Sequence, residues 1–375
     1  MFSVTGLFAQ KKNTAVNWSV AGELTPMPGQ SHTLGLAGSV CGVHDDVMFV
    51  AGGSNFPDSM PWQGGKKKYY SDIYIFKKKG NFLSPIACDF KLPESIAYSA
   101  NCSTPKGVVY AGGENEKGIS DKVYLMHWNN IAKSVIIDTL PALPVAVSNA
   151  DAASYDNIVF ITGGESKDGV SDKCWSIDIN NLASGWKRLT PAPKPVSHAV
   201  FTAIKSDGTI KLYLLGGRRK TPQGISELYN TVYEFDVAKN QWKELPALPY
   251  PISAGTGVAT GNNSIILFGG DRGTTFSKVE NYLAAISEAT SDSEKAQLTQ
   301  QKNQLLAAHP GFSKEVLLYN KKTGKCKTAG TIPFDTPVTT TAFWWNDAVI
   351  IPCGEIKAGV RTPKILMAKL RRWQR

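Results

Sequence analysis

The sequence lacks the features that three common classes of protein require. No apolar run approaches the roughly 20 residues that a membrane-spanning helix needs, so we predict no membrane span. The 6 cysteines form no Cys-x-x-Cys pair, and the 5 histidines are dispersed. There is therefore no local sign of a zinc or redox motif, and we predict no metal. A metal site assembled from residues far apart in the sequence is left open by this argument.

Acidic residues are outnumbered by basic ones, 31 to 41, which gives a net charge of +10. The basic clusters at 66–68, 77–79 and 371–372 are short and lack the interleaved aromatic residues of a nucleic-acid stacking surface, so we predict no nucleic-acid partner. We interpret these clusters as solvated loops and a charged terminus. A basic surface also raises the concentration of small anions near a cleft, which favours an anionic substrate.

A pair of glycines recurs after a short apolar run rich in β-branched and aromatic residues. The pairs are Gly52-Gly53, Gly112-Gly113, Gly163-Gly164, Gly216-Gly217 and Gly269-Gly270. Their first glycines are 60, 51, 53 and 53 residues apart, and a sixth run ends in Cys353-Gly354-Glu355 instead, after an interval of 84 residues. Such runs are typical of strands buried on both faces.

Repeats of about 40 to 50 residues with four short strands each indicate a β-propeller, in which every blade packs only against its neighbours. After each doublet comes a polar loop, then an aromatic residue on a further strand, and in two copies a tryptophan at Trp186 or Trp242. This arrangement resembles the kelch repeat. We predict an all-β chain whose residues 15–375 form a single six-bladed, kelch-type β-propeller domain.

The two ends of the chain suggest how the ring closes. The segment that follows Trp18 echoes the linker that follows Trp242, although it precedes the first doublet. We therefore expect the segment 17–20 to be the outer strand of the last blade, whose other strands come from about 339–370. Closing the ring in this way removes exposed sheet edges.

The long last interval contains a segment rich in Ala, Glu, Gln, Lys and Leu that ends near Pro310. This composition favours helix, and proline is a natural stop. We predict a helical insertion at about 277–310, on a loop between blade strands. It could be a surface hairpin or a lid over a site, and the sequence favours neither.

The first residues, 1–10, are apolar and are followed by Lys11-Lys12, but they lack a basic start and a full hydrophobic core. We interpret residues 1–14 as a residual signal-like or disordered segment, with a region of small residues at 6–9 that suits cleavage. This predicts a periplasmic or secreted bacterial protein. An ordinary ragged terminus is the alternative.

Ligands of propellers bind on one face near the central channel, so the two or three residues that follow each glycine pair are the candidates for a site. We expect the glycine-terminated strands to be the inner ones, which would bring these residues together. Carboxylates and guanidiniums are frequent among them. The candidate substrate contacts are Asn55, Glu114, Arg218 and Arg272.

The irregular sixth copy carries the most specific local signal, Gly354-Glu355-Ile-Lys-Ala-Gly-Val-Arg361-Thr362. Here the sequence resembles the bacterial N-acetylneuraminate epimerases, which are sialic acid mutarotases with six kelch blades. The resemblance implies that Glu355 is the acid-base residue and Arg361 its essential companion, that no cofactor is needed and that the substrate is a small acidic sugar. In better-known members this blade lies in the middle of the chain, so the resemblance is to a circularly permuted branch.

Interconversion of the α and β anomers of a cyclic sugar requires a base for the anomeric hydroxyl and a proton for the ring oxygen, and a carboxylate can serve as the base. Arg361 could pair with a sugar carboxylate in two-point geometry. Alternatively, Glu355 and Arg361 could form a salt bridge that only braces the loop. The chain could then be a non-catalytic propeller that binds a protein or glycan. A copper radical oxidase would need a tyrosine near a cysteine and histidine ligands, and no such grouping is present in the sequence. The oligomeric state is not predicted.

Overall fold

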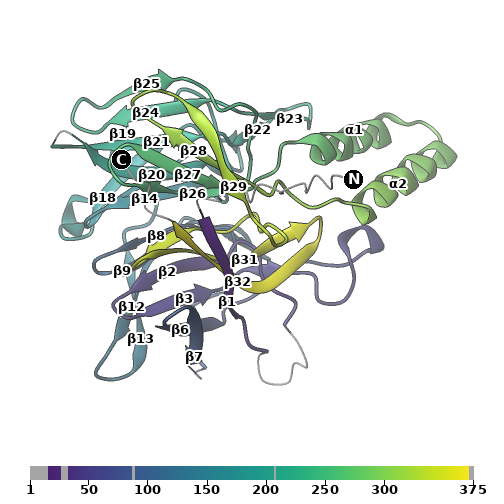
Figure 1. Ribbon diagram of the computed structural model, residues 1–375. Helices are drawn as coiled ribbons and strands as arrows, with labels where there is room; N and C mark the ends of the chain where they lie inside the picture. The colour runs from purple at the N-terminus through teal and green to yellow at the C-terminus, as the bar shows by residue number, and fades with distance from the viewer. Residues whose placement is uncertain (1–15, 27–32, 87–88, 207, 371–375) are drawn as a thin grey trace, which may run out of the picture.

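The computed structural model of the chain describes residues 16–26, 33–86, 89–206 and 208–370. The predicted signal-like segment at 1–14 lies outside these residues. Six antiparallel four-stranded sheets form the blades of a β-propeller, as predicted (Figure 1). In the described part of the chain, no helix is long and apolar enough to cross a membrane.

The first three blades follow one another in sequence. Blade 1 consists of β2 (Val40–His44), β3 (Val47–Ala51), β6 (Ile73–Lys79) and β7 (Phe82–Ile86). Blade 2 consists of β8 (Ala100–Thr104), β9 (Gly107–Ala111), β12 (Val123–Asn129) and β13 (Ser134–Leu140). Blade 3 consists of β14 (Asp151–Tyr155), β15 (Ile158–Thr162), β18 (Cys174–Asp178) and β19 (Lys187–Leu189).

The last three blades complete the ring. Blade 4 consists of β20 (Val200–Ser206), β21 (Thr209–Leu215), β24 (Val232–Asp236) and β25 (Gln241–Leu245). Blade 5 consists of β26 (Thr256–Thr260), β27 (Ser264–Phe268), β28 (Glu315–Asn320) and β29 (Cys326–Thr331). Blade 6 consists of β30 (Phe343–Trp345), β31 (Ala348–Lys357), β32 (Val360–Leu370) and β1 (Val16–Glu23).

The N-terminal strand closes the ring, as predicted. β1 pairs antiparallel with β32, with Val16 opposite Leu370 and Glu23 opposite Lys364. It is the outer strand of a sheet whose other three strands come from the opposite end of the sequence. Trp18 of β1 packs edge-on against Phe268 of blade 5, which extends the closure into the core between blades 5 and 6.

The glycine-terminated strands are not the innermost strands, contrary to our expectation. β3, β9, β15, β21, β27 and β31 each lie second in their blades, and the channel is lined by β2, β8, β14, β20, β26 and β30. The side chains of the glycine-terminated strands are almost wholly buried, because a neighbouring blade covers each face of the sheet. Val47 and Phe49 of β3, for example, are 0% exposed. In each of the first five blades, the doublet still follows the same strand, the second from the channel.

Beyond the doublets, four blades carry a short two-stranded hairpin. These hairpins pair β4 (Ser54–Asn55) with β5 (Lys68–Tyr69), β10 (Glu114–Asn115) with β11 (Gly118–Ile119), β16 (Glu165–Ser166) with β17 (Gly169–Val170), and β22 (Arg218–Lys220) with β23 (Ser226–Leu228). Blade 6 has no such interruption, because β31 and β32 continue through as long strands. Two short 3-10 helices, η1 (Pro61–Gln63) and η2 (Leu182–Ser184), lie in loops.

Blade 5 carries the predicted helical insertion, between β27 and β28. It is a pair of helices, α1 (Thr274–Glu288) and α2 (Asp292–Ala307), which project together to one side of the ring in Figure 1. The insertion begins three residues before the predicted start at 277. Pro310 follows the end of α2, in keeping with its predicted role as a stop.

The doublet glycines are required by close contacts as well as by backbone conformation. Gly163 has φ +69°, and a Cβ placed on it would lie 2.1 Å from the carbonyl oxygen of Val196. That carbonyl accepts a hydrogen bond from Gly164 N–H, so it cannot move away without cost. Gly261 has a similar φ of +61°, but nothing lies within 4 Å of a Cβ placed there.

These two glycines allow the contact to be tested separately from backbone strain. We expect Gly261→Ala to lower the free energy of unfolding by about 1–2 kcal/mol, from the left-handed backbone alone. Gly163→Ala should lower it by about 1–3 kcal/mol more, because of the overlap. Denaturant unfolding of both variants measures the difference, and equal losses would contradict this account of the doublets.

Candidate functional site

Six residues, one from each blade, close a ring of backbone hydrogen bonds at one end of the channel. Each N–H donates to the carbonyl oxygen of the preceding blade's residue, over 2.7–3.2 Å, and every member has a positive φ between 52° and 67°. We call this ring the collar, and its members are Gly38, Tyr98, Asn149, His198, Ala254 and Thr339. Five of them are not glycine, so the collar holds strained backbone of the kind that clusters at binding sites.

The collar fixes the residues that follow the glycine doublets. In every blade, the residue before the collar residue forms a β-bridge with the residue after the doublet, as Ser197 does with Arg218 and Val338 does with Glu355. The post-glycine residues therefore form a second ring around the collar. Its members are Ser54, Glu114, Glu165, Arg218, Asp271 and Glu355.

A cavity of about 390 Å³ lies over the collar, and its size is in the range of small-molecule sites. Side chains of the collar and of the post-glycine ring line it, among them Tyr98, His198, Glu165 and Asp271. Of the predicted site residues, Glu355, Arg361, Glu114 and Arg218 meet in this cavity.

Glu355 and Arg361 are paired directly across strands β31 and β32. Arg361 Nη1 donates to Glu355 Oε1 over 3.3 Å, and the backbone N–H of Gly359 donates to the same oxygen over 2.8 Å. The guanidinium also lies 4.9 Å from the ring centre of Phe56. Among the described residues, both hydrogen-bond partners of the Glu355 side chain act on Oε1, so the carboxylate is fixed in orientation while Oε2 is left for a ligand.

Arg361 is itself nearly buried, with 4% of its side chain exposed. Within the described residues, its Nε is a buried donor without a partner. A buried donor of this kind is costly unless something accepts its hydrogen. Arg361 lines the cavity, although its Nε is itself shielded from solvent.

Glu114 and Arg218 have protein partners in the same cavity. Glu114 Oε1 accepts hydrogen bonds from Tyr69 Oη over 2.8 Å and from Lys67 Nζ over 3.1 Å. Burial and the bond to Glu114 raise the pKa of Tyr69 to about 12, so Tyr69 stays a donor at neutral pH. Arg218 lies 3.7 Å from Glu165, a loose ion pair that leaves its guanidinium able to bind a further anion.

The other two predicted contacts do not line this cavity. Arg272 stacks on Tyr250, 3.7 Å from the ring centre, and pairs with Glu315. Asn55 is buried, and its amide donates to the Gly35 carbonyl over 3.0 Å while its oxygen accepts from Tyr70 Oη over 2.8 Å. Both side chains therefore hold the surroundings of the site together.

Sequence reasoning missed a buried histidine that lines the cavity. His198 Nδ1 lies 3.1 Å from Ser197 Oγ, which donates to Glu165 Oε1 over 3.1 Å, and Nε2 lies 3.4 Å from Arg218 Nη2. Burial, with the Arg218 charge in second place, holds the pKa of His198 well below its usual range. The repeated segment before each collar residue, as in Val196-Ser197-His198 and Ile252-Ser253-Ala254, could have located it.

The helical insertion forms one wall of the cavity. Phe276 and Val279 of α1, Leu306 of α2, and His309 and Phe312 beyond it are among its lining residues. α1 is anchored on blade 4, where the buried carboxylate of Glu280 accepts hydrogen bonds from Ser226 N–H over 2.7 Å and Ser226 Oγ over 2.8 Å. α2 is anchored on blade 1, where Asn303 donates to the Trp62 carbonyl over 3.2 Å. The insertion thus covers the site and is more than a surface hairpin.

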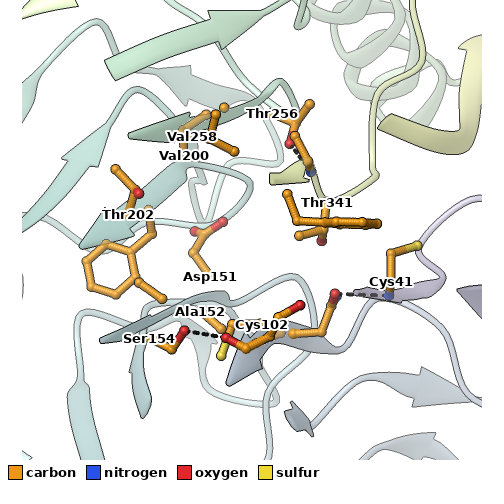
Figure 2. Close-up of a pocket in the computed structure, with 18 of the residues that line it drawn as sticks. Cys41, Cys102, Asp151, Ala152, Ser154, Val200, Thr202, Thr256, Val258 and Thr341 are labelled. Atoms are coloured by element: carbon orange, nitrogen blue, oxygen red, sulfur yellow. Dashed lines mark hydrogen bonds between the residues drawn. The ribbon is translucent and has the colours of Figure 1, made fainter. Parts of the chain in front are cut away.

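The channel on the other side of the collar holds a second cavity, of about 360 Å³ (Figure 2). Its polar side chains mostly bind the backbone of a neighbouring blade. Asn101 accepts from Cys41 N–H over 3.1 Å, and Thr256 accepts from Ala342 N–H over 2.7 Å. Asp151 accepts from Ala199 N–H over 3.1 Å, and burial raises its pKa well above the usual range. We interpret this cavity as the place where the blades are tied together.

The chain is similar in sequence and in fold to known proteins. A family model described as N-acetylneuraminate epimerase matches residues 140–374. The N-acetylneuraminate epimerase of Haemophilus influenzae (strain PittEE) is 26% identical over 238 residues, which are 62% of this chain and 59% of that protein. The one from Salmonella typhi is 27% identical over 241 residues, 64% of this chain and 60% of that protein. The chain thus spans about three fifths of the length of these relatives.

A solved structure, that of YjhT, has a similar fold. It superposes with a TM-score of 0.63 over 94% of this chain and 98% of its own, at 14% sequence identity. At that identity the likeness concerns the fold alone. The matched family region contains Glu165, His198, Arg218, Glu355 and Arg361, whereas Glu114 precedes it.

The contact between Glu280 and Ser226 can be used to test what holds α1 in the cavity wall. Glu280→Gln replaces one of the two carboxylate oxygens that accept from Ser226 with an amide N–H donor. This should lower the stability of the α1 anchor by about 1–3 kcal/mol. We expect backbone amides in α1 to exchange hydrogen faster, by mass spectrometry, while the blades stay protected. Glu288→Gln, at an exposed position of the same helix, is the control. Unchanged exchange in Glu280→Gln would show that this contact does not hold the wall.

Proposed function

We propose, on the premise that this chain belongs to the N-acetylneuraminate epimerase family, that it is a cofactor-independent mutarotase. It would interconvert the α and β anomers of N-acetylneuraminic acid or a closely related acidic sugar. The observation that carries the proposal is the Glu355–Arg361 pair inside the cavity over the collar. Glu355 Oε2 is left for a ligand there, beside the buried guanidinium of Arg361.

The reaction needs a base beside the anomeric hydroxyl. Glu355 Oε2 removes that proton, the anomeric carbon becomes a ketone, and the bond to the ring oxygen breaks. The same carboxyl group returns the proton to the ring oxygen. Rotation about the bond next to the ketone, followed by the reverse steps, closes the ring on the other face. General acid-base help of this kind contributes about 10²- to 10⁴-fold.

Positive groups in the cavity suit an acidic sugar. Arg361 holds Glu355 through Oε1 and lines the cavity. Arg218 and Lys67 add two further cations, each beside a carboxylate. Bidentate binding of a sugar carboxylate by a guanidinium would fix the orientation of the ring. Glu114, held by Tyr69 and Lys67, is a candidate second contact to sugar hydroxyls.

Two predictions about the protein stay proposals. The circular permutation is supported by the contrast between similarity over about three fifths of the relatives' sequences and a fold match over nearly the whole of YjhT. A sequence alignment keeps the order of residues in both chains. If the chain is circularly permuted, the alignment can therefore cover the segment on only one side of the permutation point. The periplasmic or secreted location stays a prediction from residues 1–14.

Proton NMR of freshly dissolved crystalline N-acetylneuraminic acid tests the activity. The wild-type protein should speed the approach to anomeric equilibrium, and Glu355→Gln should reduce this acceleration by at least about 10²-fold, because the base is lost. Arg361→Ala should reduce it as well, because Glu355 loses its main partner.

Glu244→Gln is the matched control, at an exposed position on the outer strand β25. It should retain the wild-type rate. The proposal is wrong if the wild-type protein gives no acceleration, or if Glu355→Gln is as fast as wild type. Binding of the sugar without acceleration would instead support the non-catalytic alternative.

A further inference from the structure

A histidine at the end of the helical insertion lies in the same cavity as Glu355. His309 follows α2, lines the cavity and is 8% exposed. The turn that holds it packs against the catalytic strand, because a Cβ on Gly311 would lie 3.4 Å from the carbonyl oxygen of Ile356, the residue after Glu355. The end of the insertion therefore brings His309 to the cavity that Glu355 also lines.

A single backbone hydrogen bond decides which nitrogen of His309 carries the proton. The N–H of Gly311 donates to Nδ1 over 3.0 Å, so Nδ1 is an acceptor. In the neutral imidazole the proton must then be on Nε2. Among the residues that the structure describes, none accepts a hydrogen bond from Nε2. The ring thus brings one unused N–H donor to the cavity.

The charge state of His309 agrees with this tautomer. Burial lowers the pKa of His309, and Lys357 acts in the same direction, while the carboxylates of Asp271 and Glu355 act against them. Protonation would also place a hydrogen on Nδ1, facing the N–H of Gly311. The imidazole is therefore neutral at pH 7, a good donor and a poor source of protons.

The two unused groups match the reacting atoms of a cyclic sugar. Glu355 Oε2 is an acceptor, and His309 Nε2–H is a donor. A hemiketal presents one hydroxyl donor and one ring-oxygen acceptor on the same carbon. Glu355 Oε2 therefore suits the anomeric hydroxyl, and His309 Nε2–H suits the ring oxygen.

We propose that His309 is a catalytic hydrogen-bond donor that binds the sugar ring oxygen while Glu355 acts on the anomeric hydroxyl. This inference rests on the proposed mutarotase function. When the bond from the anomeric carbon to the ring oxygen breaks, the electron pair stays on that oxygen, and Nε2–H stabilises the negative charge. The protonated carboxyl of Glu355 then supplies the proton, so His309 gains and loses none. Such preorganised donors act on charge that develops in the transition state.

Two substitutions separate this role from a structural one. His309→Asn keeps an acceptor near Nδ1 for Gly311 N–H and removes the donor at Nε2. His309→Gln keeps a donor near Nε2 and removes the acceptor. A catalytic donor predicts a loss of about 10²-fold in kcat for His309→Asn, with little change in KM, and a loss within about tenfold for His309→Gln. A purely structural role predicts the reverse order.

The measurement is the NMR mutarotation rate at several sugar concentrations, with thermal unfolding of each variant. His127→Asn and His127→Gln are the controls, since His127 lies 3.1 Å from Asp138 on blade 2, outside the cavity. The inference is overturned if folded His309→Asn matches wild type, or if it loses no more activity than His309→Gln. Absence of acceleration by wild type would instead count against the mutarotase function itself.

A second readout does not depend on activity. In protein with ¹⁵N-labelled histidine, the His309 ring should give the shifts of a neutral imidazole protonated at Nε2 at pH 7. Protonation at Nδ1, or a doubly protonated ring, would overturn the inference whatever the mutarotation rates show.

Discussion

The site depends on the collar, the closed ring of six backbone hydrogen bonds at one end of the channel. Each bond joins two neighbouring blades, so the circuit exists only when all six are in place. The β-bridge beside each collar residue then fixes the height of the residue after the glycine doublet. Side chains from six separate repeats, far apart in sequence, are brought to one cavity in this way. The strain of five non-glycine residues at positive φ is the cost of that arrangement.

Blade 6 differs from the other blades at the position of the glycine doublet. Cys353 and Gly354 replace the doublet, with φ 37° and 120°, and β31 and β32 run on without the break that separates blade from hairpin in blades 1 to 4. Glu355 and Arg361 consequently sit opposite each other on one continuous pair of strands. A site built on strands is held more rigidly than one on a loop. The irregular repeat is therefore the place best suited to a catalytic pair.

Much of this could be predicted from the sequence, because the informative features repeat. The doublets gave the blade count, and the echo of the Trp242 linker at Trp18 gave the ring closure. The post-glycine positions of Glu114, Arg218 and Glu355 placed them in one cavity. Arg272 and Asn55 lie second after their doublets, one residue beyond the equivalent positions of Glu114 and Arg218, and their side chains bind Glu315 and the Gly35 carbonyl outside the cavity. His198 was missed because its signal, the repeated segment before each collar residue, lies apart from the glycine doublets. His309 was missed because a lone histidine carries no spacing signal.

The helical insertion shows a different limit. Its composition predicted helix, but whether it covered a site depended on contacts with distant segments, Glu280 with Ser226 and Asn303 with Trp62. Nothing in the local sequence of α1 or α2 specifies those partners. The wall of the cavity, like the collar, therefore forms only when segments from different blades come together in the folded ring.

A crystal structure of the protein with N-acetylneuraminic acid bound tests the central claim most directly. The account predicts that the sugar lies in the cavity over the collar, with its anomeric hydroxyl within hydrogen-bond distance of Glu355 Oε2 and its carboxylate on a guanidinium. A sugar bound in the channel on the other side of the collar, or one whose anomeric carbon faces away from Glu355, would contradict it.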